Sequence, residues 1–298
     1  MTPAPAGGVR GGALGPVLGA LRCPVCGSPL HRALPTTLGC PSGHRFDIAR
    51  QGYVSLLRGG GGGGLSSDTA AMIAARRDAL DSPPYRALRD AVARTVADGL
   101  PATSAHPLLV DAGCGTGQYL ASCLDARDDA LGLGLDLSKY AARATAGAHR
   151  RAAAVVADLW QPWPVADGSA AAVVSVFAPR GFDEVRRVLE PGGFLVVVTP
   201  RPEHLGELVE PMGMVGVEPD KHERLSAGLA RAGFASVHRA AFTRCDDWGA
   251  AEVADAVAMG PSAFHAEPDR LRARAAELVG PAGSVAVTLS VDLTVARS

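Results

Sequence analysis

The sequence predicts an α/β protein with an open, mostly parallel sheet, preceded by a small metal-dependent module. The stretch from Leu108 to Gln118 runs from a short apolar strand into a glycine-rich turn. Apolar and helix-like segments alternate after it, as in a doubly wound sheet. Cysteine and histidine pairs at metal-ligand spacing precede it. At 298 residues, the chain can hold one large domain and a small appendage.

Charge and cysteine usage narrow the class of protein. Residues 1–60 carry six arginines and one aspartate, a charge of +5. The net charge of the chain is −1, so the remaining residues carry a charge of −6. A basic N-terminal part on an acidic body favours contact with a polyanion. No apolar run reaches the ~18 residues that span a bilayer, so we expect no membrane partner. Six cysteines, three of them clustered early, favour metal binding in a reducing compartment, and we expect a cytoplasmic protein.

The first motif is a predicted zinc site. Cys23 and Cys26 form one C-x2-C pair, and Cys40 and His44 form a C-x3-H pair after thirteen intervening residues. Two such pairs supply the four tetrahedral ligands that zinc prefers. Three thiolates and an imidazole leave no open coordination position, so the zinc is structural. A module this small has little core, so the metal supplies its folding free energy.

Composition divides the chain into four predicted parts. The segment 46–57 has alternating apolar positions and is expected to form an edge strand or a hairpin that closes the small domain. The run of glycines that follows has no side chains to pack and indicates a flexible linker. The parts are a disordered leader at 1–20, a zinc-binding module at 21–58, a linker at 59–66 and an α/β domain at 67–298.

Two helices are expected ahead of the sheet. The segment 66–80 has helical composition, with Ser67 or Asp68 as its N-cap. A second helix begins at Pro83 and extends to about Ala97, because proline is favoured in the first turn of a helix.

The glycine-rich turn carries the cofactor prediction. Glycine can take positive φ and lets a ligand approach the backbone N–H groups. The third glycine comes one residue earlier than in the dinucleotide fingerprint, and an acidic residue ends the strand. The pattern resembles the first motif of Rossmann-like class I S-adenosylmethionine-dependent methyltransferases. The motif residues expected to contact S-adenosylmethionine are Asp111, Gly113, Gly115, Gly117 and Gln118.

Acidic residues follow the next two predicted strands. Asp136 ends the strand 131–135, where a carboxylate can bind the ribose hydroxyls of a nucleoside cofactor. Ser138 is expected to cap the helix 139–149. Asp158 ends the strand 153–157 and is placed to meet the adenine amino group.

The remaining segments complete a methyltransferase-like sheet. Strands are expected at 172–177, 194–199 and 235–242, and helices at 203–214, 220–232, 246–259 and 268–278. The chain ends on an alternating segment, 284–296, which suits the final antiparallel strand of such a sheet.

Taken together, the motifs resemble the 23S ribosomal RNA guanine-N1 methyltransferases with an N-terminal zinc module, closest to the tylosin-resistance branch of macrolide producers. The matching stretches run in order from about residue 21 to the C-terminus. They are CPVC, RFDIARQGYVSLL, MIAARRDALDSPPY, LLVDAGCGTGQYL, GLDLSK, VFAPR, EPGGFLVVVTPRPEHLGEL and MGPSAFH.

The resemblance implies methyl transfer from S-adenosylmethionine to guanine N1 in a 23S ribosomal RNA hairpin, with a homodimer as the active form. It implies zinc ligands at Cys23, Cys26, Cys40 and His44. It also implies cofactor contacts at Tyr85, Gly117, Gln118 and His204. Guanine N1 carries a proton that a general base must remove, and the sequence alone does not name this base.

Two alternatives stay open from the residues. An NAD-dependent oxidoreductase with a zinc appendage would use Asp136 equally well to bind ribose. A catalytically inactive zinc-dependent RNA-binding protein could retain the same fold.

Overall fold

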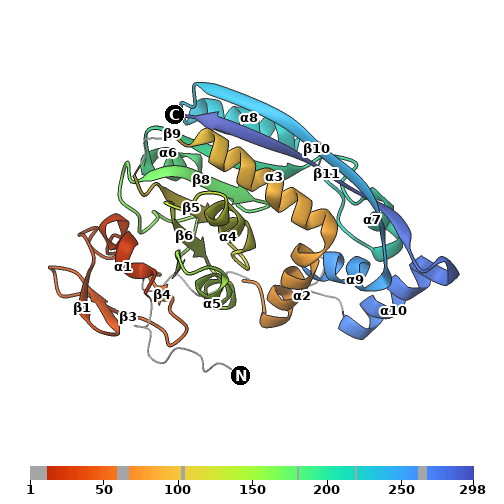
Figure 1. Cartoon of the computed structure of the whole chain (residues 1–298), viewed down its shortest axis with the longest axis horizontal. Helices are drawn as coiled ribbons and strands as arrows, with labels where there is room; N and C mark the ends of the chain where they lie inside the picture. Colours follow the sequence, from red (N-terminus) through yellow and green to blue (C-terminus); the bar gives the residue numbers. More distant parts are fainter. Residues whose placement is uncertain (1–11, 59–66, 102–104, 180, 219, 261–266) are drawn as a thin grey trace.

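The large domain is built on one eight-stranded sheet (Figure 1). The computed structural model describes residues 12–58, 67–101, 105–179, 181–218, 220–260 and 267–298. The strand order is β10-β11-β9-β8-β5-β6-β7-β4. The strands are β4 (Val54–Ser55), β5 (Leu108–Ala112), β6 (Leu131–Asp136), β7 (Ala152–Val156), β8 (Ala170–Val176), β9 (Leu189–Pro200), β10 (Ser236–Trp248) and β11 (Val285–Arg297).

The central strands are parallel, and β10 and β11 are antiparallel. Parallel strands covered on both faces are mostly apolar, and all five residues of β5 are buried, Asp111 among them. The order of the strands reverses direction between β5 and β8, so a ligand site is expected at the carboxyl ends of β5 and its neighbours. The α/β class and the mostly parallel sheet predicted from the sequence are confirmed.

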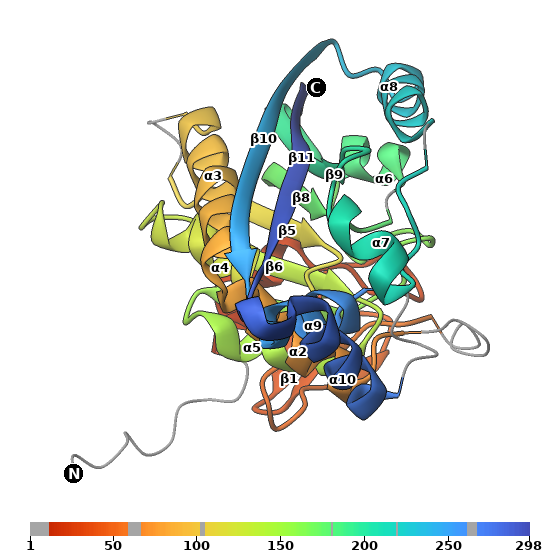
Figure 2. The same ribbon diagram turned by 90° about the vertical axis from the view of Figure 1, so that its right-hand side faces the viewer.

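Helices cover both faces of the sheet, as Figure 2 shows. On one face, α3 (Pro83–Gly99) and α4 (Gln118–Asp125) pack through Leu88, Val92 and Leu120. On the other, α6 (Phe182–Val188) and α8 (Lys221–Arg231) pack through Val185 and Leu225. The helix α5 (Lys139–Ala148) follows β6 and packs against β7.

Four further helices gather beyond the carboxyl edge of the sheet. The helix α2 packs against α9, and α10 packs against α9 and α7. Their bounds are α2 (Ala70–Asp81), α7 (Gly206–Met212), α9 (Ala250–Ala258) and α10 (Pro268–Val279). None of the helices that the structure describes is long and apolar enough to cross a membrane.

The N-terminal module has its own three-stranded sheet, made of β1 (His31–Leu34), β2 (Thr37–Gly39) and β3 (Arg45–Asp47). Its later strand, β4, instead pairs in parallel with β7 and extends the large sheet. Residues 46–57 were expected to form an edge strand or a hairpin that closes the small domain. Ile48 forms an antiparallel bridge with Val54, as in such a hairpin, and β4 is an edge strand, but of the large sheet, because Val54 aligns with Val155 of the large domain.

Part of the predicted leader is also ordered. Residues 14–17 form α1 (Leu14–Val17), and Leu14 and Val17 are buried in the core on the α6 and α8 side of the sheet. The disordered-leader prediction is wrong for this segment, because Leu14, Val17 and Leu21 present one apolar face to the sheet. Residues 1–11 and the predicted linker 59–66 lie outside the described residues.

Two element boundaries differ from the prediction. The helix α2 begins later than expected, and its N-cap is Thr69, whose side chain accepts a hydrogen bond from the Met72 N–H. Residues 246–248, expected to be helical, end β10. The hairpin of β10 and β11 keeps pairing as far as Trp248 and Val285, which overrides the local helix preference.

Candidate functional site

The four predicted zinc ligands lie together in the N-terminal module. Their ligand atoms, from Cys23, Cys26, Cys40 and His44, all lie within 4.8 Å of one another. The Cys26 and Cys40 sulfurs are 3.7 Å apart, and His44 Nδ1 lies 3.3 Å from the Cys40 sulfur. A tetrahedral site with Zn–S bonds of about 2.3 Å has ligand-to-ligand edges of about 3.8 Å. The donor set and its spacing therefore fit a closed structural zinc site.

Two tight turns place these ligands. The Gly27 N–H donates to the Cys23 carbonyl at 2.9 Å, and the Gly43 N–H donates to the Cys40 carbonyl at 3.0 Å. Both glycines have positive φ, which other residues adopt only with strain. His31 has an exposed side chain and is not part of the ligand cluster.

The glycine-rich turn leaves β5 at the carboxyl edge of the sheet. Gly113, Gly115 and Gly117 all have positive φ. A Cβ on Gly113 would lie 2.4 Å from the Ala178 Cβ, and one on Gly117 would lie 2.8 Å from the Thr145 Cα. Only glycine fits this path, so the turn brings bare backbone to the site that the sequence predicts for a cofactor.

Asp136 joins this turn to the end of β6. Its Oδ2 accepts a hydrogen bond from the Gly115 N–H at 2.9 Å, and its Oδ1 accepts one from the Ser138 N–H at 2.8 Å. Ser138 caps α5 as predicted, since its hydroxyl accepts from the Tyr140 and Ala141 N–H groups. A carboxylate oxygen has two lone-pair positions, so each oxygen can still accept a ligand hydroxyl.

Asp111 lies under the turn and is 2% exposed. Burial, and then the negative charge of Asp136, raise the pKa of Asp111 to about 7. Burial also raises the pKa of Asp136. Both carboxyl groups therefore hold a proton more tightly than an exposed carboxyl does.

The segment that begins at Asp68 covers this edge, a feature that sequence reasoning missed. The Arg76 guanidinium pairs with Asp68 and donates to the Met259 carbonyl at 2.9 Å, which links α2 to the end of α9. A Cβ on Gly115 would lie 3.2 Å from Arg76 Nη1, so this cation lies directly over the turn. Asp68 also accepts the Ser138 hydroxyl through its carbonyl. No local pattern reveals this contact, since Arg76 and Gly115 lie on separate elements.

Gln118 begins α4 and faces the same covering helix. Its amide donates to Asp81 Oδ1 at 2.7 Å, and its Oε1 accepts from the Thr116 hydroxyl at 2.6 Å. Tyr85 is buried beside Trp248, with 5.9 Å between ring centroids. Its hydroxyl has no hydrogen-bond partner among the described residues.

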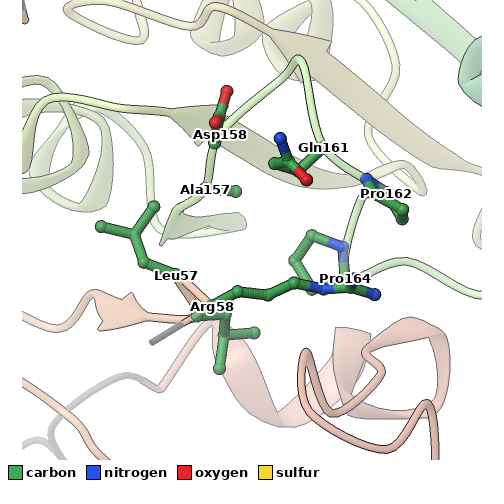
Figure 3. A pocket seen from close by; sticks show the side chains of 8 residues that line it. Leu57, Arg58, Ala157, Asp158, Gln161, Pro162 and Pro164 are labelled. Atoms are coloured by element: carbon green, nitrogen blue, oxygen red, sulfur yellow. The ribbon is translucent and has the colours of Figure 1, made fainter. Parts of the chain in front are cut away.

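Asp158 lies beside a separate cavity of about 210 Å³ between the two domains (Figure 3). Leu57 and Arg58 line it from the N-terminal module, and Gln161 and Pro164 line it from the large domain. Asp158 Oδ1 accepts the Trp160 N–H at 2.9 Å. Asp111, Gly115 and Asp136 are not among its lining residues. The structure thus joins Gly115 to Asp136 by a hydrogen bond, with Asp111 buried in β5, and places Asp158 after the neighbouring strand β7.

His204 lies beyond the end of β9. Its ring is 5.5 Å, centroid to centroid, from that of Phe177, which follows β8 with a φ of 52°. The Ser290 N–H donates to His204 Nδ1 at 3.3 Å. Burial lowers the pKa of His204 to about 4. The ring is therefore neutral near pH 7, and its proton is on Nε2.

Known proteins share this arrangement of domains. Residues 21–58 match the zinc-ribbon family described as "RlmA, N-terminal", and residues 109–193 match the family described as "Methyltransferase domain". The 23S rRNA (guanine(748)-N(1))-methyltransferase of Streptomyces fradiae is 46% identical over 277 residues, 93% of this chain and 96% of that protein. A protein of Micromonospora griseorubida, provisionally named a 23S rRNA (guanine-N(1)-)-methyltransferase, is 49% identical over 292 residues, 92% of this chain and 95% of its own.

Proposed function

The chain belongs to the family of 23S rRNA (guanine-N1)-methyltransferases, and from this premise we propose how its residues carry out that reaction. The substrate is an unpaired guanine in a hairpin loop of 23S ribosomal RNA, and the methyl donor is S-adenosylmethionine. The observation that carries the proposal is the junction of the positive-φ turn 113–117 with Asp136 at the carboxyl edge of the sheet. An oxidoreductase function is not supported, since the relatives at 46–49% identity are named as methyltransferases.

We propose that the residues of this junction hold the cofactor. The backbone of Gly113, Gly115 and Gly117 would contact its amino-acid part, and the free lone pairs of Asp136 would accept its ribose hydroxyls. Asp111 and Asp136 favour its positive sulfonium group. When bound, S-adenosylmethionine supplies an electrophilic methyl group.

Four further side chains are proposed as cofactor contacts. The Tyr85 hydroxyl, which has no hydrogen-bond partner among the described residues, is on α3, and the Gln118 amide is on α4, which packs against α3. Asp158 follows β7, on the side where the adenine would lie. His204 would donate a hydrogen bond from Nε2, because its Nδ1 already accepts the Ser290 N–H. The low pKa of His204 makes it a poor base, so its role is that of a donor.

The protein's part in catalysis is to align the two reactants. The target nitrogen is on the Watson–Crick edge, so the base must be unpaired or flipped out before transfer. In-line attack on the methyl group then depends on positioning. The zinc site has four protein ligands and no open position, so zinc supports the fold and takes no part in methyl transfer.

The N-terminal module would bind the RNA. It carries most of the arginines of the +5 segment, and its strand β4 fixes it to the large sheet beside the Asp158 cavity. We propose a homodimer acting in the cytoplasm on ribosomal RNA. We also propose that the methylation protects the ribosome against tylosin-type macrolides.

Primer extension on 23S ribosomal RNA tests the proposal. N1-methylation blocks base pairing, so RNA from cells with this protein should give a reverse-transcriptase stop that is absent without it. Purified protein should also transfer label from S-adenosylmethionine to the same hairpin. A folded, zinc-loaded protein that transfers no label would be an inactive RNA-binding protein and would refute the proposal.

A further inference from the structure

A buried carboxylate lies near the carboxyl edge of the sheet, at the ends of β9 and β11. Asp292 on β11 pairs with Thr199, next to the last residue of β9, and it is 1% exposed. Arg201 Nη1 lies 3.2 Å from its Oδ1, and His222 Nε2 lies 2.5 Å from its Oδ2. Oδ2 accepts no aligned hydrogen bond from the described residues, so the His222 ring is its nearest polar neighbour.

His222 lies at the same edge as the methyl-transfer site. The strand β10 begins at Ser236, which pairs with Arg297. Arg297 in turn pairs with Phe194 on the amino half of β9, so β10 begins at the amino end of the sheet. The helix α8 runs toward the first residue of β10, so the first residues of α8 lie at the opposite, carboxyl end of the sheet. Lys221 acts electrostatically on the His204 ring, which stacks on Phe177 at the end of β8.

The two histidines at this edge have different free nitrogens. His204 accepts the Ser290 N–H through Nδ1, so its second nitrogen carries a proton. His222 places Nε2 2.5 Å from Asp292 Oδ2, although among the described residues no aligned hydrogen bond reaches that oxygen, so Nδ1 is the ring nitrogen that does not contact the carboxylate. Its side chain is 36% exposed, so the ring is not enclosed by the protein. A buried carboxylate that holds one nitrogen of a histidine sets its tautomer and stabilises the imidazolium.

We propose that His222 is the general base that removes the guanine N1 proton, with Asp292 as its positioning residue. The inference rests on the proposed function. The His222 Nδ1 lone pair takes the N1 proton while N1 forms a bond to the donor methyl carbon. The methyl–sulfur bond breaks, its electron pair stays on sulfur, and S-adenosylhomocysteine leaves. The imidazolium then releases its proton to water.

Other charged groups face this pair. Arg201 contacts both Asp292 and Glu203, and the Ser290 hydroxyl donates to Glu203 at 2.8 Å. The Ser290 hydrogen bond and then Arg201 lower the pKa of Glu203 to about 2. Lys221 and Arg224 lie on α8 itself, and Arg224 pairs with Glu218. Asp292 is thus the carboxylate in direct contact with the His222 ring, while Glu203 is paired with Arg201.

The test uses His222→Gln in the zinc-loaded full-length protein, with His238→Gln on the exposed strand β10 as the matched control. The turnover rate on a 23S hairpin RNA should fall by about 100-fold or more, as expected for loss of a general base. KM for RNA and the affinity for S-adenosylhomocysteine should stay within about threefold, since no cofactor contact is lost. His238→Gln should match the parent.

Rescue by an added base separates a base from a structural residue. Added imidazole should restore part of the His222→Gln rate and leave the His238→Gln rate unchanged. Asp292→Asn should lower the turnover rate while KM for RNA stays within about threefold, because Asp292 acts through the His222 ring.

Two results overturn the assignment. One is a His222→Gln rate within threefold of the parent, and the other is a loss confined to KM. If the parent itself transfers no label, the proposed function fails first, and the base assignment fails with it.

Discussion

Replacing Asp111 by asparagine should stabilise the folded protein, and the gain should grow with pH. Asp111 is 2% exposed, and burial, followed by the charge of Asp136, raises its pKa from 3.8 to about 7. A raised carboxyl pKa means that the folded state binds the proton more tightly than the unfolded state does. The stabilisation that comes from this tighter proton binding is complete below pH 3.8 and is lost as the pH rises toward 7.

The size of the effect follows from the same shift. Compared with a carboxyl whose pKa does not change on folding, Asp111 destabilises the folded state by about 2 kcal/mol at pH 5.5 and about 4 kcal/mol at pH 8.5. Asparagine removes this cost and adds a pH-independent term for its buried amide. The change in unfolding free energy caused by Asp111→Asn should therefore rise by about 2 kcal/mol between pH 5.5 and 8.5.

Urea unfolding of the zinc-loaded protein at pH 5.5, 7.0 and 8.5 measures this difference. Asp128→Asn is the matched control for the same chemical change at an exposed position, because Asp128 is exposed in the loop after α4. A difference for Asp111→Asn that stays flat within about 0.5 kcal/mol, or that falls with pH, would refute the reasoning.

Three further predictions concern the same two domains. Asp136→Asn should weaken S-adenosylhomocysteine binding by about 10-fold or more in isothermal titration, because hydrogen bonds to a charged group contribute about 1.5–3 kcal/mol; an unchanged affinity would remove Asp136 from the site. Gly117→Ala should destabilise the protein by about 1–3 kcal/mol in urea unfolding, because the residue has a φ of 76° and its Cβ would meet Thr145. An unfolding free energy of Gly117→Ala equal to that of the parent would mean that the turn tolerates a side chain. Cys40→Ser, or chelation of zinc, should weaken RNA binding in a filter assay more than S-adenosylhomocysteine binding; equal losses would show that zinc supports the whole fold rather than the RNA-binding module.

Local patterns in the sequence were enough for the zinc cluster and for the mostly parallel α/β fold. The four ligands lie on two short knuckles, so their spacing along the chain determines how they can meet. The parallel strands are mostly apolar and are separated by amphipathic helices, which is a pattern visible within each segment. The cap at Ser138 and the positive φ of Gly113, Gly115 and Gly117 also follow from local geometry.

Interactions between distant segments were not predictable in this way. The leader prediction failed because Leu14 and Val17, which have helical spacing, are buried only through their contact with a face of the sheet. The short strand β4 was assigned to the zinc module, since the sequence of Val54–Ser55 does not indicate that the strand pairs with β7. The helix expected at 246–248 became strand because β11 supplied a partner as far as Trp248.

The sequence by itself determined which residues could bind zinc and which turn could expose bare backbone, because those properties depend on residue type and near-neighbour spacing. Tertiary structure decided that Arg76 lies over Gly115, that Asp158 lines a separate cavity, and that His222 meets Asp292. Each of these contacts joins elements far apart in the chain. Their geometry depends on how the helices pack on the sheet, and no local pattern encodes that packing.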